Sequence, residues 1–128
     1  MNDQTPTPIT DVLTVGVPVT DQNQALAFYV DTLGFETRRD MPLPQSGRWL
    51  EVAPPGASVT IALVPARDGA PAGVQTGIRF RTTDAAATHQ ALRDRGVDVG
   101  ELLSWPGVPP MFTIDDQDGN GLTIIEAA

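Results

Sequence analysis

The chain has 128 residues, enough for one domain with a hydrophobic core and too few for two independent domains. It contains no cysteine and no lysine, which excludes disulfides, thiolate metal sites, thiol nucleophiles and Schiff-base chemistry on a lysine. The formal net charge of −8 argues against nucleic acid or membrane partners, and no segment resembles a signal peptide or a membrane span, so a cytoplasmic protein is expected.

The first half of the chain predicts a strand, a helix and three further strands. Apolar residues alternate with polar or small ones along Ile9–Val19, as in a strand with one buried face. Asp21 is the expected N-cap of a helix that runs to about Thr32, and Gly34 suits the left-handed residue that ends it. Shorter strands are expected at Phe35–Met41, Arg48–Ala53 and Ser58–Val64.

The second half predicts the same order of elements after a linker at residues 65–76, which is rich in Ala, Gly and Pro. A strand is expected at Gly77–Thr82, with Asp84 as the N-cap of a helix over Ala85–Arg95. Three strands are then expected at Val97–Leu103, Met111–Ile114 and Gly121–Glu126.

The two halves also repeat each other in sequence at a spacing of sixty-three residues. Thr20-Asp21 matches Thr83-Asp84, and Thr60-Ile61 matches Thr123-Ile124, while Gly34 meets Gly96 one residue out of step. The repeat predicts an α+β fold in which two tandem βαβββ modules form a concave sheet. We expect a single domain over residues 1–128, with module one at about 9–64 and module two at about 77–126.

Each predicted sheet has one apolar face, which must meet the helices, and one mixed, concave face. In the first module the apolar face carries Leu13, Val15, Val17, Leu50, Val52, Ile61 and Leu63. The concave face carries Thr14, Gly16, Trp49, Glu51, Thr60 and Ala62 in the first module, and Gly77, Arg79, Arg81, Phe112, Ile114, Thr123 and Ile125 in the second.

Aromatic rings, hydroxyls and opposite charges on one face are typical of a pocket for a small molecule. The candidate ligand-binding residues are Thr14, Trp49, Thr60, Arg81, Trp105, Phe112, Ile114 and Thr123. The alternative interpretation is structural: Trp49 and Phe112 fill the space between two sheets, and Arg79 and Arg81 are solvated edge residues.

Glu51 and Arg79 are the candidate catalytic residues. Burial in an apolar concavity raises the pKa of a carboxyl group, so Glu51 is a candidate general acid or base, with Arg79 stabilising an anion or enolate. The alternative is that the two side chains pair and only orient the pocket. The one histidine, His89, lies in the predicted second helix, where a solvated residue is expected rather than a metal ligand.

Three segments carry a resemblance to a known family. They are Val19–Phe35 around the first helix, Arg48–Gly56, and the turn Asp115–Leu122, in which Gln117 stands where proline is usual. Together they resemble the vicinal oxygen chelate superfamily of glyoxalases, bleomycin-resistance proteins and extradiol dioxygenases, over nearly the whole chain. That resemblance implies the paired-module fold and, from its drug-binding members, a homodimer.

The resemblance also gives four positions at which metal-dependent members hold a divalent ion. They fall at or near Thr14, Thr60, Gly77 and Thr123, and none is His, Asp or Glu. We therefore expect no metal and no other cofactor.

Three functions remain open. The first is metal-independent binding, in which the pocket sequesters an aromatic or cationic small molecule. The second is a metal-independent isomerase, epimerase, cyclase or lyase that uses Glu51. The third is a metal-dependent, glyoxalase-like lyase with unusual ligands.

Overall fold

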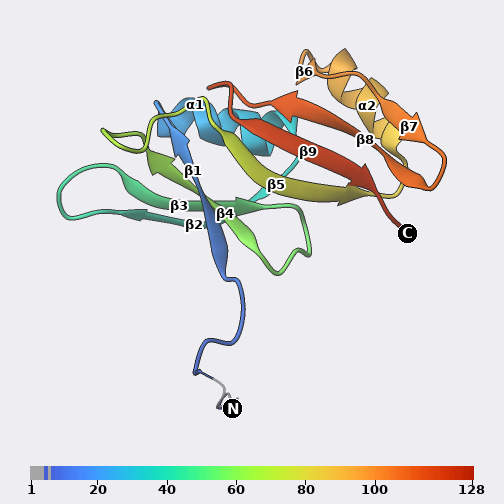
Figure 1. Cartoon of the computed structure of the whole chain (residues 1–128). Coiled ribbons are helices and arrows are strands. Elements are labelled where there is room, and N and C mark those ends of the chain that lie inside the picture. The colour runs from blue at the N-terminus through green and yellow to red at the C-terminus, as the bar shows by residue number, and fades with distance from the viewer. Residues whose placement is uncertain (1–4, 6) are drawn as a thin grey trace.

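The chain forms two β-sheets with a helical segment each, and the computed structural model describes Thr5 and residues 7–128 (Figure 1). The first half contains β1 (Thr14–Val19), α1 (Gln22–Leu26), the π-helical η1 (Ala27–Thr32), β2 (Glu36–Pro42), β3 (Arg48–Ala53) and β4 (Thr60–Pro65). The second half contains β5 (Gln75–Thr82), α2 (Ala85–Asp94), β6 (Asp98–Val99), β7 (Leu103–Trp105), β8 (Val108–Asp115) and β9 (Gly121–Glu126). The α+β class predicted from the repeat is confirmed.

Several element boundaries depart from the sequence prediction. β1 begins at Thr14, so Leu13 lies outside the strand and is exposed rather than part of the apolar face. β5 begins at Gln75, inside the segment expected to be a linker, and β8 begins at Val108 instead of Met111. The single strand expected over Val97–Leu103 is divided into β6 and β7, because residues 100–102 leave the ladder.

Both helices begin at the predicted caps. The Asp21 carboxylate accepts hydrogen bonds from the backbone N–H groups of Asn23 and Gln24, and Asp84 accepts one from Ala87. Gly34 and Gly96 follow the helical segments with a φ of +82° each, the left-handed conformation that suits glycine.

The two sheets share one topology. Sheet one has the order β1-β4-β3-β2, and sheet two has the order β5-β9-β8-β6 with β7 added beside β8. The first strand of each half pairs in parallel with the last one, and the remaining pairs are antiparallel. β1 and β5 therefore each lie at an edge of their sheet.

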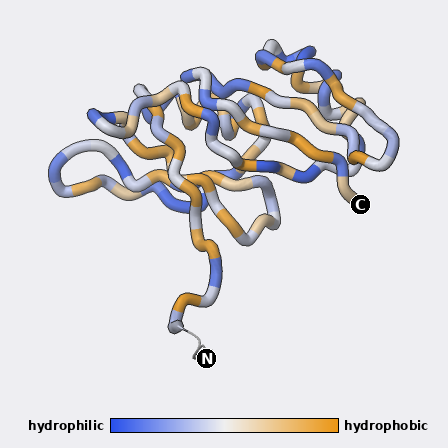
Figure 2. The backbone as a smooth tube through the Cα atoms, viewed as in Figure 1, coloured by the Kyte–Doolittle hydropathy of each residue, from blue (hydrophilic) through white to orange (hydrophobic). Residues whose placement is uncertain are grey.

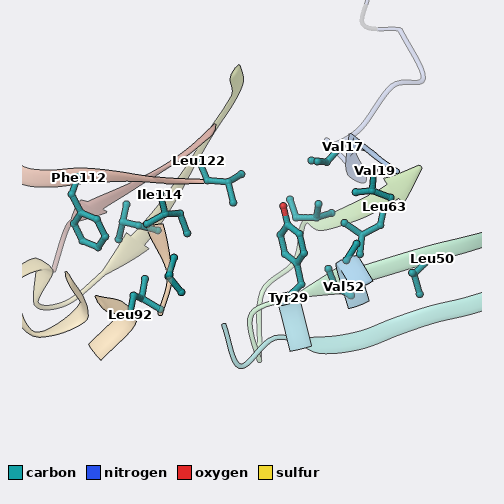
Figure 3. Packing of buried hydrophobic residues seen from close by; sticks show 14 of the residues in the cluster. Val17, Val19, Tyr29, Leu50, Val52, Leu63, Leu92, Phe112, Ile114 and Leu122 are labelled. Atoms are coloured by element: carbon teal, nitrogen blue, oxygen red, sulfur yellow. The ribbon is translucent and has the colours of Figure 1, made fainter. Parts of the chain in front are cut away.

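One hydrophobic core joins the two halves. In Figure 3 the residues from sheet two and α2 lie on one side of this core, and Tyr29 with the residues of sheet one lies on the other. Figure 2 shows hydrophobic and hydrophilic residues alternating along the strands. Each sheet buries one face in this common core, so its other face points away; we call these the outer faces of sheet one and sheet two. The buried set includes Val17, Val19, Tyr29, Leu50, Val52, Leu63, Leu92, Phe112, Ile114 and Leu122.

A buried polar cluster holds the halves together where the β8–β9 turn meets the end of β1. Asp116 accepts a hydrogen bond of 2.7 Å from the Tyr29 hydroxyl, and the Asn120 side-chain amide donates to the Pro18 carbonyl at 2.8 Å. The Asn120 side-chain oxygen also accepts from the backbone N–H groups of Gly73 and Val74. The turn that resembles the family signature is thus a junction between modules. Among the described residues, no helix is long and apolar enough to cross a membrane.

Candidate functional site

The outer face of sheet one brings together side chains that are far apart in the sequence. Thr14 of β1 is paired with Thr60 of β4, and Glu51 of β3 lies between Ala62 of β4 and Arg39 of β2 in the strand register. Alternate residues of a strand share a face, so Trp49 lies on the same face as Glu51. Four of the predicted site residues therefore meet here: Thr14, Trp49, Glu51 and Thr60.

Glu51 is the centre of this site and is only 7 % exposed. One carboxylate oxygen accepts a 2.6 Å hydrogen bond from the Thr60 hydroxyl, and the other accepts a 2.6 Å hydrogen bond from the Trp49 indole N–H. The hydroxyl oxygens of Thr14 and Thr60 lie 2.8 Å apart, which continues the chain of polar contacts. The Arg39 Nε lies 3.9 Å from the second oxygen.

These contacts determine the charge of Glu51. The hydrogen bond from Thr60 lowers the pKa of the Glu51 carboxyl most, and the Trp49 hydrogen bond and the Arg39 charge lower it further. Burial acts in the opposite direction but is outweighed. The expectation of a raised pKa was wrong because burial was inferred without the two donors. At neutral pH the site holds a carboxylate.

The outer face of sheet two carries positive charge instead. Arg79 pairs with Thr123, and Thr123 pairs with Thr113, so these three residues share the face; Arg81, two residues along β5, points the same way. Arg79 donates a hydrogen bond to the Gly77 carbonyl of its own strand. Among the described residues no ion pair joins Glu51 to Arg79, because the outer faces of the two sheets point away from the same core.

Phe112 and Ile114 are not on this face, which corrects the sequence prediction. Both are buried in the core, opposite Ile124 and Leu122, and the Phe112 ring packs edge-on against His89 with centroids 4.9 Å apart. In the β3–β4 hairpin, Glu51 pairs with Ala62, an odd number of positions later in the chain. In the β8–β9 hairpin, Phe112 pairs with Ile124, an even number of positions later, so the two hairpins differ in length by an odd number of residues. A constant repeat offset therefore assigns β8 to the wrong face, since a shift of one residue reverses every side chain.

Two exposed tryptophans lie on different sheets of the chain. Trp49 is 38 % exposed on β3, and Met41 of β2 is its cross-strand partner. Trp105 is exposed at the end of β7, in the hairpin with β8 (Figure 1). The sequence prediction missed Met41 and Arg39; their positions opposite Trp49 and Glu51 depend on the β2–β3 register, which includes an irregularity between Thr37 and Arg39.

The four positions that correspond to metal ligands in the resembling family provide poor donors. Thr14 and Thr60 face each other on sheet one, and Thr123 lies on sheet two near Gly77, which has no side chain. Threonine hydroxyls are weak ligands for zinc, nickel or iron, so this donor set does not fit such an ion. Among the described residues, no group of three or more His, Cys, Asp or Glu side chains is placed to hold a metal ion.

His89 is half-buried rather than solvated, which corrects a further expectation. One ring nitrogen lies 2.8 Å from the Gly100 carbonyl oxygen, and the ring packs against Phe112. These contacts fix the position of α2 on sheet two. The histidine is a structural residue of the second module.

The chain is similar to known proteins over most of its length. The model of the Glyoxalase/Bleomycin resistance protein/Dioxygenase superfamily matches residues 11–124. The Bacillus subtilis protein YetH is 33 % identical over 116 residues, which cover 88 % of this chain and 94 % of YetH. TnmS3, an antibiotic binding protein from Streptomyces sp. CB03234, superimposes with a TM-score of 0.86 at 35 % identity and covers 96 % of this chain and 100 % of its own. A superfamily member from Sphaerobacter thermophilus gives a TM-score of 0.87 at 35 % identity, with 93 % and 98 % covered.

Proposed function

The chain belongs to the glyoxalase/bleomycin resistance protein/dioxygenase superfamily, and from this premise we propose that it binds a small aromatic compound without the help of a metal ion. The observation that supports this most is the site around Glu51. It combines an ionised, nearly buried carboxylate with a half-exposed indole ring on the outer face of sheet one. The ring offers a stacking surface, and the carboxylate offers an acceptor for a cationic or N–H-bearing group.

Binding fits this site better than acid–base catalysis. A general base works best when its pKa lies near the working pH, whereas the hydrogen bond from Thr60 moves the pKa of Glu51 the other way. The proposed catalytic partner Arg79 lies on the other sheet of the same chain. The site therefore favours holding a ligand over moving a proton. The similarity to TnmS3, an antibiotic binding protein, supports the same choice.

The proposal includes a homodimer, because a single chain leaves the site open on one side. β1 and β5 are edge strands, and exposed edges are positions at which another strand pairs. Pairing of β1 with β5 of a second copy gives a continuous sheet in the order β2-β3-β4-β1-β5-β9-β8-β6. Trp49 then lies near one end of that sheet, and Trp105 of the other copy lies near the opposite end. Because long sheets twist and curve, the two rings become two walls of one cavity.

In this arrangement the outer face of sheet two completes the ligand site. Arg79, Arg81 and Thr123 of one copy lie on the same concave surface as Glu51 and Trp49 of the other. The sequence-predicted residues from the two modules would thus meet between chains rather than within one chain. Phe112 and Ile114 are excluded from the site, because they are buried in the core.

The two tryptophans allow a direct test. The protein is screened against aromatic compounds with and without a basic amine. Binding is followed by thermal shift and by quenching of tryptophan fluorescence. A ligand raises the melting temperature because it binds only the folded state. Quenching in both Trp49→Phe and Trp105→Phe proteins, each with one remaining tryptophan, is expected if both rings line the cavity.

Glu51→Gln tests the carboxylate in the same assay. We expect the dissociation constant for an amine-bearing compound to rise by at least about tenfold, since a hydrogen bond to a charged group is worth about 1.5–3 kcal/mol. Glu101→Gln, a change at an exposed carboxyl on another loop, is the matched control and should leave binding unchanged. Conversion of the compound on incubation, or stoichiometric zinc, nickel or iron in the purified protein, would contradict the proposal.

A further inference from the structure

Arg79 and Arg81 of β5 form a pair of cations without an acidic partner. Both are exposed and lie two residues apart on the outer face of sheet two, which places their Cα atoms about 7 Å apart. The Arg79 guanidinium donates to the Gly77 carbonyl of its own strand, and that of Arg81 has no polar partner among the residues that the structure describes. In a chain with a formal net charge of −8, these two side chains are a local positive charge, which we call the positive patch.

No acid of the same face lies close enough to balance the positive patch. Asp98 of β6 and Asp115 of β8 pair with each other on this face, and β9 separates β8 from β5 (Figure 1). Strands lie about 4.8 Å apart, so Asp115 is roughly 10 Å or more from the backbone of β5. Two like charges on one face of a strand repel each other. An anionic oxygen placed between them removes this repulsion, and guanidinium groups bind such oxygens with good geometry.

The same face offers an apolar surface next to the positive patch. Arg81 pairs with Ile125, and Ile125 pairs with Met111, so two half-buried apolar side chains continue from Arg81 across the sheet. Two residues along the strand, Arg79 pairs with Thr123, which adds a hydroxyl donor beside the guanidinium groups. A flat compound can therefore lie with its ring on Ile125 and Met111 and its charged oxygen at the positive patch.

The charges of the two sheets differ, and together they define the ligand more narrowly. On sheet one, the Glu51 carboxylate has Arg39 at 3.9 Å, so its charge is partly balanced within the chain. On sheet two, Arg79 and Arg81 form none of the ion pairs found among the described residues. A compound whose only charge is a basic amine leaves the positive patch unsatisfied. A compound with an anionic oxygen and an N–H group satisfies both faces.

We propose that the ligand is an aromatic compound with an anionic oxygen, held by Arg79 and Arg81 while its ring lies on Ile125 and Met111. This inference rests on the proposed function, because it names the class of compound that the protein binds there. The four residues lie on one sheet of one chain, so the anion contact itself forms without a second copy. Arg79 and Arg81 thereby become the residues that select acidic aromatic compounds over neutral ones.

Two fluorescent compounds that differ by one acidic group test this selection. The probe is anilinonaphthalene sulfonate, an aromatic anion with an N–H group, and its neutral counterpart is phenylnaphthylamine, which lacks the sulfonate. Each is titrated at neutral pH and low salt, where charge contacts are least screened. We expect the sulfonate to bind at least about tenfold more tightly. Arg79→Gln/Arg81→Gln should raise its dissociation constant by at least about tenfold and leave that of phenylnaphthylamine unchanged, since the lost hydrogen bonds are charge-assisted.

A matched double variant separates the positive patch from the overall charge. Arg67→Gln/Arg93→Gln removes the same charge at two exposed arginines, one in the linker and one on α2, and should change neither dissociation constant. Equal affinities of the two compounds for the unaltered protein, or an equal loss in this control, overturn the anion contact and leave the ligand-binding proposal standing. If neither compound binds and the aromatic screen yields no ligand, the anion contact and the proposed function are overturned together.

Discussion

Asp116 and Glu51 are two nearly buried carboxylates with opposite surroundings. Asp116, 6 % exposed, accepts four hydrogen bonds: from the Tyr29 hydroxyl, from the Asn120 side chain, and from the backbone N–H groups of Asp118 and Asn120. Glu51 accepts one hydrogen bond on each oxygen and lies beside an exposed tryptophan. A carboxylate has about four acceptor positions. The chain itself therefore fills all the acceptor positions of Asp116 but not those of Glu51.

The difference separates a structural carboxylate from a binding one. Asp116 joins the β8–β9 turn to η1 of the first module, so its contacts hold the two modules together. Glu51 keeps acceptor capacity on an outer face that the single chain leaves open. Loss of Asp116 should therefore affect folding, whereas loss of Glu51 should affect ligand recognition.

Asp116→Ala should have the largest effect on stability. It leaves the Tyr29 hydroxyl and the Asn120 amide buried without their shared acceptor, and unsatisfied partners of a charged group are costly. We expect a loss of about 3–5 kcal/mol in the free energy of unfolding, measured by urea denaturation at one protein concentration. Asp68→Ala, at an exposed residue between the modules, is the control. A loss below about 1 kcal/mol would show that the junction does not depend on this carboxylate.

Tyr29→Phe should have the next largest effect. The ring remains in the core and only one of the four hydrogen bonds to Asp116 is lost, so about 1.5–3 kcal/mol is expected. Burial, together with the neighbouring Asp116 charge, raises the pKa of the Tyr29 hydroxyl above its ordinary value. A pH titration of the tyrosine absorbance should therefore show no ionisation near pH 10 while the protein is folded. Ionisation near pH 10 in the folded protein would contradict the buried contact.

The sequence predicts the local features of the fold, but not the contacts between distant residues that distinguish the two carboxylates. The caps Asp21 and Asp84 and the bounds of β3 and β9 follow from turn residues and alternation within a few positions. The Tyr29–Asp116 hydrogen bond joins residues 87 positions apart, and no local pattern indicates it.

Register explains the remaining errors. Alternation predicts that Glu51 and Trp49 share a face, as the structure has them. The direction in which the pKa of Glu51 shifts depends on Thr60, nine positions away, which only the β3–β4 pairing brings within reach. The repeat, taken at a constant offset, predicts the wrong face for Phe112, because the two hairpins have unequal lengths. Local alternation identifies a strand, but the strand's partner decides which face is buried.

Trp49→Phe should affect stability less than Tyr29→Phe. Each change removes a donor to a buried carboxylate, but Trp49 lies on an open face, where water can replace the indole N–H. We expect a loss below about 1 kcal/mol by the same denaturation assay. A loss as large as that of Tyr29→Phe would mean that Trp49 is a structural residue, and it would weaken the contrast between the two carboxylates.

Thr60→Val should give a small effect that depends on pH. Because the pKa of Glu51 is lowered on folding, its contribution to stability is present above the ordinary value of 4.5 and disappears as the pH falls through the lower, folded value. Removal of the Thr60 hydroxyl takes away the largest cause of that lowering. We expect a loss of about 1 kcal/mol at pH 7 that shrinks toward pH 3, measured by thermal unfolding across this range. Thr113→Val, on the outer face of sheet two, should show no such pH dependence. A Thr60→Val loss that is equal at pH 7 and pH 3 would mean that the hydroxyl acts on packing and not on the charge of Glu51.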